Sequence, residues 1–206
     1  MGDFIYQAVL RLPVLLIAIT VHEYAHARVA YYYGDPTAKA QGRLSLNPLV
    51  HLDPLGALML LTVGIGWAKP VPINPYNFRD YRSGLLWVSF AGPLANFILA
   101  FASLFLLRIV RWDFIGGQTL FLLLYVQATI NIALGVFNLV PVPPLDGSKI
   151  FASLARGPVL AFYRRFEPYA PLLLVVLLIT GFLGRIIWPV TEIIKQGMLR
   201  ILQFIS

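Results

Sequence analysis

The feature that most constrains this chain is a series of apolar stretches, several of them near the length of about 20 residues that a helix needs to cross a bilayer. They lie at about residues 4–33, 85–107, 119–140 and 169–182. Hydrophobic residues make up 59% of the chain and charged residues 12%, whereas soluble domains have roughly 45–50% and 25%. A single cleaved signal peptide does not explain so many stretches. The pattern predicts an all-α integral membrane protein, a polytopic helix bundle of about five or six segments.

The net charge of +7 does not indicate a nucleic-acid partner, because Lys and Arg are scattered between the apolar stretches rather than gathered in a basic arm. An excess of Lys and Arg in cytoplasmic loops explains the charge better. The chain has no cysteine, so disulfides, thiolate ligands and cysteine nucleophiles are excluded. Any metal site must therefore use His, Asp or Glu.

A shorter apolar segment at residues 55–67 decides the expected topology. As a helix it would reach only about 20 Å, which is too short to cross the hydrocarbon core, so we expect a re-entrant segment. Most loop Lys and Arg residues then fall on one side of the membrane, which the positive-inside rule assigns to the cytoplasm. These residues are Lys39, Arg43, Lys69, Arg79, Arg82, Lys149, Arg156, Arg164 and Arg165.

For two regions the sequence is compatible with more than one structure. Residues 39–48 contain turn residues with some alternation, which fits either a connecting loop or a short β-hairpin whose edge pairs with an unwound substrate. Residues 186–205 form one apolar helical stripe, so this segment either spans the bilayer or lies at its interface. We find no linker or repeat and expect one membrane-embedded domain over residues 1–206.

His22-Glu23-Tyr24-Ala25-His26 is an H-E-x-x-H motif. On a helix, residues four apart lie on one face, so both imidazoles can point at one metal ion. Zinc accepts such a pair together with one further protein ligand and an open position. Glu23 lies beside that face, where it can take a proton from a water molecule at the metal.

The pentapeptide also arises by chance, so its setting matters. Here it lies in an apolar stretch, following residues such as Leu15, Leu16 and Ile17. An ionisable group inside a membrane helix costs about 2.5 kcal/mol or more unless it is paired, which makes a functional role the default interpretation. We therefore interpret His22 and His26 as metal ligands.

Asp146 is the best candidate for the third ligand. It follows a proline-rich stretch that breaks the preceding apolar helix, and Gly147 lets the backbone turn beside the carboxylate. Taken alone, an Asp-Gly pair after prolines is more often a plain loop turn. Its combination with the H-E-x-x-H motif favours a ligand.

With these motifs, the chain resembles the site-2 protease family of intramembrane zinc metalloproteases. The matching pieces occur in the family's order along the chain. They are the H-E-x-x-H motif at 22–26, Asn47-Pro48-Leu49-Val50-His51-Leu52-Asp53-Pro54-Leu55-Gly56, Gly92-Pro93-Leu94-Ala95-Asn96, and Asn138 through Gly147.

The resemblance implies one Zn²⁺ per chain, held by His22, His26 and Asp146, with Glu23 as general base and acid. It also implies an ion below the membrane surface, nearer the cytoplasmic side. The chain is similar to the minimal form of the family, without a PDZ or CBS domain. Relatives often have another membrane helix before the metal-binding one, whereas here the motif lies in the first helix.

Three further polar residues have two interpretations each. Asn96 and Asn138 would either contact the substrate backbone or oxyanion, or form hydrogen bonds between helices. His51 is either a group near the metal or a solvated loop histidine.

The leading hypothesis is an endopeptidase that hydrolyses peptide bonds of membrane-spanning proteins or peptides, in regulated intramembrane proteolysis. A prokaryotic inner membrane suits a chain of this size, with the active site toward the cytoplasm. The alternatives are a small transporter or ion-binding protein that uses the same buried His and Asp residues, and a scaffold with a structural zinc ion. The sequence does not indicate the oligomeric state or the identity of the substrate.

Overall fold

The computed structural model describes residues 2–56, 59 and 67–205, and within them the chain is helical, with one isolated β-bridge between Leu52 and Ala68. The expected all-α class is therefore confirmed. The elements are α1 (Gly2–Tyr32), α2 (Thr37–Ala40), η1 (Pro48–Val50), η2 (Pro75–Asn77), α4 (Tyr81–Ile109), α5 (Gly117–Asn138), α6 (Asp146–Leu154), α7 (Gly157–Phe166), η3 (Glu167–Tyr169), α8 (Ala170–Ile179) and α9 (Phe182–Ile205).

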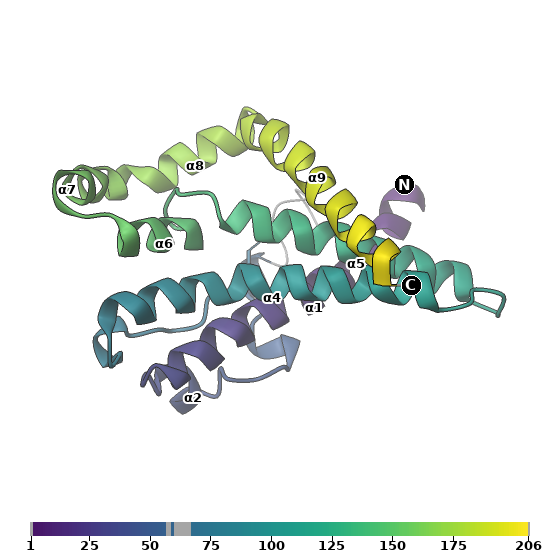
Figure 1. Ribbon diagram of the computed structural model, residues 1–206, viewed down its shortest axis with the longest axis horizontal. Helices are drawn as coiled ribbons and strands as arrows, with labels where there is room; N and C mark the ends of the chain where they lie inside the picture. The colour runs from purple at the N-terminus through teal and green to yellow at the C-terminus, as the bar shows by residue number, and fades with distance from the viewer. Residues whose placement is uncertain (1, 57–58, 60–66, 206) are drawn as a thin grey trace.

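Three long helices form the centre of the molecule. α4 packs against both α1 and α5, and α9 lies along α5 (Figure 1). Several alanines are completely buried, and such small residues let helix backbones approach closely in a membrane bundle. They are Ala18, Ala27, Ala30, Ala100 and Ala128. The helices α6 and α7 lie together at one end, and α8 and α9 form an arch above α5 in Figure 1.

Two helices among the described residues are long and apolar enough to cross a membrane, Tyr81–Ile109 and Gly117–Asn138. A third candidate span exists if the pair Gly157–Ile179 and Phe182–Phe204, which is bent by 75°, counts as one. The membrane class predicted from the apolar stretches therefore agrees with the helices, while the expected count of five or six segments is not confirmed. α1 carries the polar residues of the H-E-x-x-H motif within its apolar sequence.

The β-hairpin considered for residues 39–48 is not confirmed. α2 continues to Ala40, and the chain then turns through Gly42, whose φ of +67° is readily adopted only by glycine. The backbone N–H of Arg43 bonds back to the carbonyl of Ala38. These local hydrogen bonds replace the cross-strand bonds that a hairpin would need.

The segment expected to be re-entrant, 55–67, lies mostly outside the described residues. The described residues on its two sides meet: Leu52 and Ala68 form the β-bridge, and Lys69 N–H donates to the His51 carbonyl at 3.0 Å. The described residues before and after this segment therefore lie side by side, and its re-entrant topology stays a prediction.

The last helix matches the expected amphipathic tail in part. Its buried residues recur at helical spacing, and Leu183, Ile187 and Leu202 pack into apolar clusters with α5. Lys195, a charged residue of this helix, is nevertheless buried and donates to the Tyr125 hydroxyl at 3.1 Å. The short helices α6 and α7 are not predicted by the sequence analysis, because prolines and charges interrupt residues 141–168.

A buried carboxylate ties the end of α1 to the segment that precedes α4. Asp35 accepts hydrogen bonds from the backbone N–H of Thr37 and Asn74 and from the Asn77 side chain, at 3.1, 2.7 and 2.8 Å. Burial by itself would raise the pKa of Asp35, but these hydrogen bonds outweigh it and hold the pKa below its usual value. The ionised carboxylate therefore stabilises the fold.

We expect Asp35→Asn to lower the stability of the detergent-solubilised protein by about 1–3 kcal/mol, because charge-assisted hydrogen bonds to a buried group are lost. Since the folded-state pKa is depressed, this contribution is complete above the unfolded pKa of about 4 and is lost as pH falls through the folded value. Thermal unfolding of both proteins across acidic pH measures the difference. Asp113→Asn, at a carboxylate whose side chain is 82% exposed, is the control. A difference that persists unchanged at the most acid pH would contradict this account.

Candidate metal centre and active-site pocket

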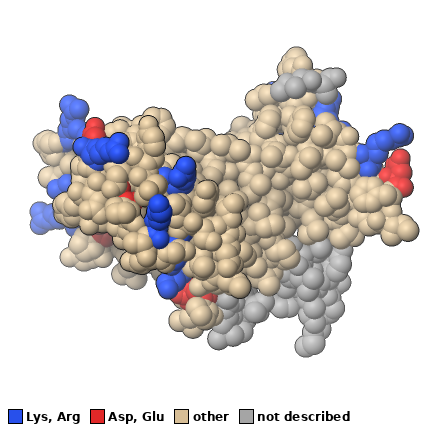
Figure 2. Space-filling model, turned by 90° about the horizontal axis from the view of Figure 1, so that it is seen from below, with Lys and Arg blue, Asp and Glu red and all other residues tan. Residues whose placement is uncertain are grey.

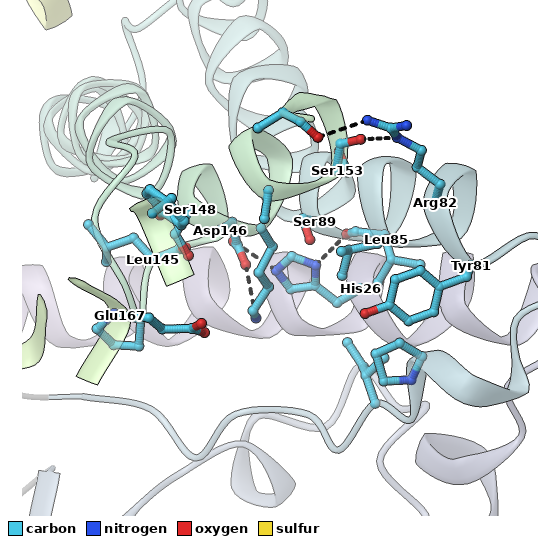
Figure 3. A pocket seen from close by; sticks show the side chains of 18 of the residues that line it. His26, Tyr81, Arg82, Leu85, Ser89, Leu145, Asp146, Ser148, Ser153 and Glu167 are labelled. Atoms are coloured by element: carbon cyan, nitrogen blue, oxygen red, sulfur yellow. Dashed lines mark hydrogen bonds and ion pairs between the residues drawn. The ribbon is translucent and has the colours of Figure 1, made fainter. Parts of the chain in front are cut away.

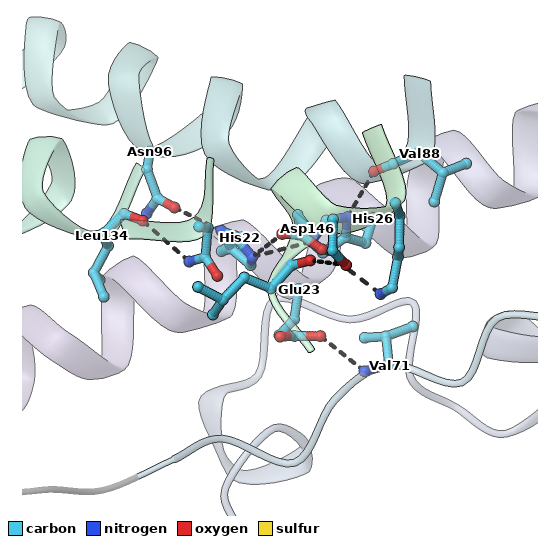
Figure 4. Close-up of polar contacts among 12 residues, drawn as sticks. His22, Glu23, His26, Val71, Val88, Asn96, Leu134 and Asp146 are labelled. Atoms are coloured by element: carbon cyan, nitrogen blue, oxygen red, sulfur yellow. Dashed lines mark hydrogen bonds and ion pairs between the residues drawn. The ribbon is translucent and has the colours of Figure 1, made fainter. Parts of the chain in front are cut away.

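Three side chains from two distant parts of the chain converge at one buried point (Figure 4). His22 and His26, one turn apart on α1, bring their Nε2 atoms within 3.0 Å of each other. The Asp146 Oδ2 atom, at the start of α6, lies 3.2 Å from the first nitrogen and 3.0 Å from the second. These residues form a group that could hold a metal ion, as the H-E-x-x-H spacing and the Asp-Gly turn predict.

The hydrogen bonds of the two imidazoles determine which ring nitrogen of each histidine faces the cluster. His22 Nδ1 lies 2.6 Å from the Asn96 Oδ1 atom, and His26 Nδ1 lies 2.6 Å from the Val88 carbonyl oxygen. Both partners only accept, so each Nδ1 donates its proton and each Nε2 faces the other ring and the carboxylate. When both rings are neutral, the lone pairs of the two Nε2 atoms face one another in a buried site, an arrangement that a metal cation between them would stabilise.

The separations also suit zinc. Ligand atoms at about 2.0–2.1 Å from a tetrahedral zinc ion lie about 3.3–3.4 Å apart, only slightly more than the 3.0–3.2 Å between these three atoms. Two imidazoles and one carboxylate are also the ligand set of several catalytic zinc sites, which leave a fourth position open. The residues therefore fit a catalytic zinc ion.

One face of α4 provides the hydrogen-bond acceptors and the space that the two histidines need. Val88, Gly92 and Asn96 are spaced four residues apart, so they lie in one row on the helix. The first accepts from His26 and the last from His22. A Cβ atom on Gly92, between them, would lie 2.4 Å from His26 Nε2 and 2.6 Å from His22 Nε2. Only glycine leaves room for both rings at this position.

Asn96 is completely buried and its hydrogen bonds are all used within the protein. Its amide nitrogen donates to the Ala18 carbonyl at 3.2 Å and to Asn131 Oδ1 at 2.7 Å, which leaves its oxygen for His22. Asn131 in turn donates to the Gln127 carbonyl at 2.8 Å. Asn96 therefore holds the His22 ring through hydrogen bonds between helices.

A close backbone approach positions Asp146. A Cβ atom on Gly147 would lie 2.2 Å from the Leu139 carbonyl oxygen, so glycine lets the start of α6 pack on the end of α5. The second carboxylate oxygen of Asp146 lies 3.7 Å from Lys149 Nζ, one turn further along α6. At the other end of α6, Arg82 of α4 donates to the carbonyls of Ser153, Leu154 and Ala155.

The cluster borders a cavity of about 740 Å³ (Figure 3). Glu23 faces this cavity, and one of its carboxylate oxygens accepts from Val71 N–H at 2.8 Å. The walls come from α1, α4, α6 and α7 and from the segment before η2. The Val71 contact is not visible in the sequence, because a backbone donor has no residue signature.

The other two candidates occupy different places. Asn138 lines the cavity, and its amide donates to the Leu134 carbonyl at 3.1 Å. His51 is buried and donates from Nε2 to the Ser45 carbonyl at 2.8 Å. It lines a second, smaller cavity of about 120 Å³ that has no residue of the metal cluster in its walls.

Comparisons with known proteins agree with this geometry. Residues 115–180 match the model of Peptidase family M50. The chain is 39% identical to "Putative zinc metalloprotease YwhC" of Bacillus subtilis over 98% of its own length and 96% of that protein. It is 32% identical to "Putative zinc metalloprotease Rip2" of Mycolicibacterium smegmatis, over 82% of this chain and 66% of that protein. "Zinc metalloprotease MJ0392" of Methanocaldococcus jannaschii is 28% identical over 75% of this chain and 36% of that protein. No solved structure gives a significant match.

Helices of membrane-spanning length, a buried cluster that suits zinc and these relatives together define an intramembrane zinc metalloprotease. The chain belongs to peptidase family M50, the site-2 proteases, as its motifs predict. Zinc is accordingly the cofactor, and the transporter alternative is not favoured. Proteases of this family act on membrane-embedded substrates.

We expect Gly92→Ala to lose bound zinc while the protein keeps its helical content, because the added methyl group would occupy the space of both imidazole rings. Displacing groups that orient ligands costs about 10–100-fold in metal affinity. Metal analysis and circular dichroism of the purified variant measure the two effects. Gly197→Ala, where a Cβ would meet no atom within 4 Å, is the control. A variant with full zinc occupancy and affinity would refute the proposed fit.

We expect Asn96→Ala to lower zinc affinity by about 10–100-fold, because the His22 ring loses the acceptor that fixes its orientation. Competition with a zinc chelator of known affinity measures the change. Asn138→Ala is the matched control, since Asn138 contacts no residue of the cluster by hydrogen bond in the structure and should retain zinc affinity. Equal losses in both variants would indicate a general loss of packing.

Proposed function

We propose that His22, His26 and Asp146 hold the catalytic zinc ion and that Glu23 is the general base and acid of peptide hydrolysis. The observation that carries the proposal is the convergence of two imidazole nitrogens and a carboxylate oxygen within 3.2 Å, beside a cavity that Glu23 also faces. A bound zinc ion supplies a Lewis acid that lowers the pKa of water and polarises the peptide carbonyl.

The residues of the chain perform the proton transfers. Glu23 follows His22 by one residue, so its side chain leaves α1 about 100° away from the ligand face and enters the cavity. Val71 N–H holds one of its carboxylate oxygens, which leaves the other oxygen to take a proton from the attacking water. The same carboxyl group then delivers the proton to the leaving nitrogen.

Asn138 is the better candidate of the two asparagines for contact with the substrate. It lies on the cavity wall and uses its amide nitrogen once, for the Leu134 carbonyl, so the second amide hydrogen is free for a peptide carbonyl or the oxyanion. Asn96 uses its two donors and its oxygen within the protein. We assign Asn96 to positioning His22.

The proposed reaction is regulated intramembrane proteolysis of membrane-spanning substrates by a single catalytic domain over residues 1–206. An intact transmembrane helix hides its carbonyls in its own hydrogen bonds, so the scissile segment must unwind before it reaches the cluster. We further propose a prokaryotic inner membrane with the site toward the cytoplasm. The cavity extends to Arg82, Arg156 and Arg164, and the positive-inside rule places such residues on the cytoplasmic side.

We expect Glu23→Gln to abolish cleavage and to leave zinc binding unchanged, because the amide cannot accept the proton and does not belong to the ligand set. The test uses purified protein in vesicles with a panel of transmembrane-helix peptides, together with zinc analysis. His22→Ala, which should lose both zinc and activity, is the comparison variant. Full cleavage by the Glu23→Gln variant would reject the mechanism.

A further inference from the structure

The short helix α7 has two faces with different surroundings. Leu160, Tyr163, Arg164 and Glu167 line the active-site cavity, and their spacing of i, i+3, i+4 and i+7 puts them on one face. Tyr163 attaches this face to the protein: its ring lies 4.9 Å from that of Phe151, and its hydroxyl donates to the Pro141 carbonyl at 3.2 Å.

The opposite face of α7 carries an apolar stripe. Val159, Phe162 and Phe166, at i, i+3 and i+7, are 56%, 65% and 54% exposed. The two phenylalanine rings contact each other with centroids 4.7 Å apart. This surface continues into η3 and α8, where Tyr169, Leu172 and Leu173 are also exposed. Because the protein is an intramembrane protease, an apolar surface continuous with an apolar helix is expected to face lipid.

Charge and length place α7 at the surface of the bilayer rather than across it. Its own 10 residues reach only about 15 Å as a helix, half of the hydrocarbon thickness, and it belongs to an arm of membrane-spanning length, Gly157–Ile179, only together with η3 and α8. The charges of this arm gather on α7 and not on α8: Arg164 and Arg165 lie in the last turn of α7 and Arg156 precedes its first residue. Arg156 and Arg164 line the cavity, whereas Arg165 is exposed outside it. Lys and Arg side chains gather at the end of the molecule that carries α7 (Figures 1 and 2). Arginines beside an apolar stripe are typical of helices that lie at the interface and bind anionic headgroups.

We propose that α7 docks on the bilayer interface, with Val159, Phe162 and Phe166 inserted among the lipids and Arg165, which does not line the cavity, paired with anionic headgroups. The cavity-facing side of the same helix is a wall of the active site, so the lipid surface sets the position of that wall. The partner is the membrane itself, in addition to the proposed peptide substrate, and this role does not depend on the identity of that substrate.

The chain has no cysteine, so single cysteines report on α7 without interference. The full-length protein carries a nitroxide label at Phe162→Cys or Phe166→Cys, with Ala161→Cys as the matched control: residue 161 is exposed on the same helix and belongs to neither stripe. In phosphatidylcholine vesicles with added phosphatidylglycerol, labels at 162 and 166 should collide more with oxygen, which concentrates in lipid, than with a water-soluble nickel chelate. The label at 161 should show the reverse order.

The anionic part of the proposal has its own measurement. Replacing phosphatidylglycerol by phosphatidylcholine, adding salt, or combining Phe162→Cys with Arg165→Gln should each move the label at 162 toward water, because screening or removal of charge weakens headgroup binding. If the depth of the label at residue 162 stays the same after all three changes, headgroup binding does not contribute to docking.

Three results would overturn lipid docking as a whole. Equal exposure of 161, 162 and 166 to water would mean that the stripe is uncovered. Equal immersion of all three in hydrocarbon would mean that α7 spans the bilayer. Spin–spin broadening at 162 that depends on the ratio of protein to lipid would mean that a second copy of the chain covers the stripe. Zinc content equal to that of the parent protein shows that each labelled variant is folded.

Discussion

Two imidazole nitrogens and a carboxylate oxygen lie within 3.2 Å of one another in the interior of a membrane protein, and the packing of three helices follows from that arrangement. Each imidazole can turn its lone pair inward only if an acceptor binds its opposite nitrogen. α4 supplies both acceptors at the spacing of the histidines on α1, and Gly92 between them lets the two helices approach. α6 then has to begin where Asp146 completes the group.

The cavity beside the cluster requires non-helical backbone next to a membrane helix, and its polar groups need partners because lipid offers none. The segment that contains Lys69, Val71 and Asn74 meets this requirement. Their N–H groups donate to the His51 carbonyl, the Glu23 carboxylate and the Asp35 carboxylate. Pro70 and Pro72, between them, have no N–H to satisfy. The two prolines thus remove two of the six backbone donors of residues 69–74, and Glu23 is one of the acceptors.

The sequence predicts the parts of this structure that depend on helical periodicity. The four-residue spacing of His22 and His26 places both on one face, and the long apolar stretches correspond to α1, α4, α5 and α8, while the amphipathic stretch 186–205 falls within α9. The position of Asp146 beside the histidines is predictable because its carboxylate follows a broken helix and accompanies an H-E-x-x-H motif. The resemblance of four motifs to one family strengthens the same assignment.

What the sequence does not predict depends on backbone atoms and on tertiary contacts. The acceptor for His26 is the Val88 carbonyl and the donor to Glu23 is the Val71 N–H, and any residue type could supply either. Asn96 has two interpretations in the sequence because an amide can face a neighbouring helix or a substrate. The structure settles its contacts through Ala18 and Asn131, which occupy both of its donors. The backbone N–H groups of Gly42 and Arg43 bond to carbonyls three and five residues back, so this part of the chain turns, which residue alternation does not reveal.

A hydrolase inside a membrane must also bring water to a buried site, and the cavity indicates a route. The same space that borders His22 and His26 is lined further out by Arg156, Arg164 and Glu167, which need hydration or polar partners. A continuous cavity from charged residues to the metal cluster lets water approach without crossing hydrocarbon. The wall of this route is formed partly by α6, which carries Asp146, and by α7. A displacement of that end of the molecule would therefore alter the water path and the position of Asp146 together, which links the position of the protein in the bilayer to its chemistry.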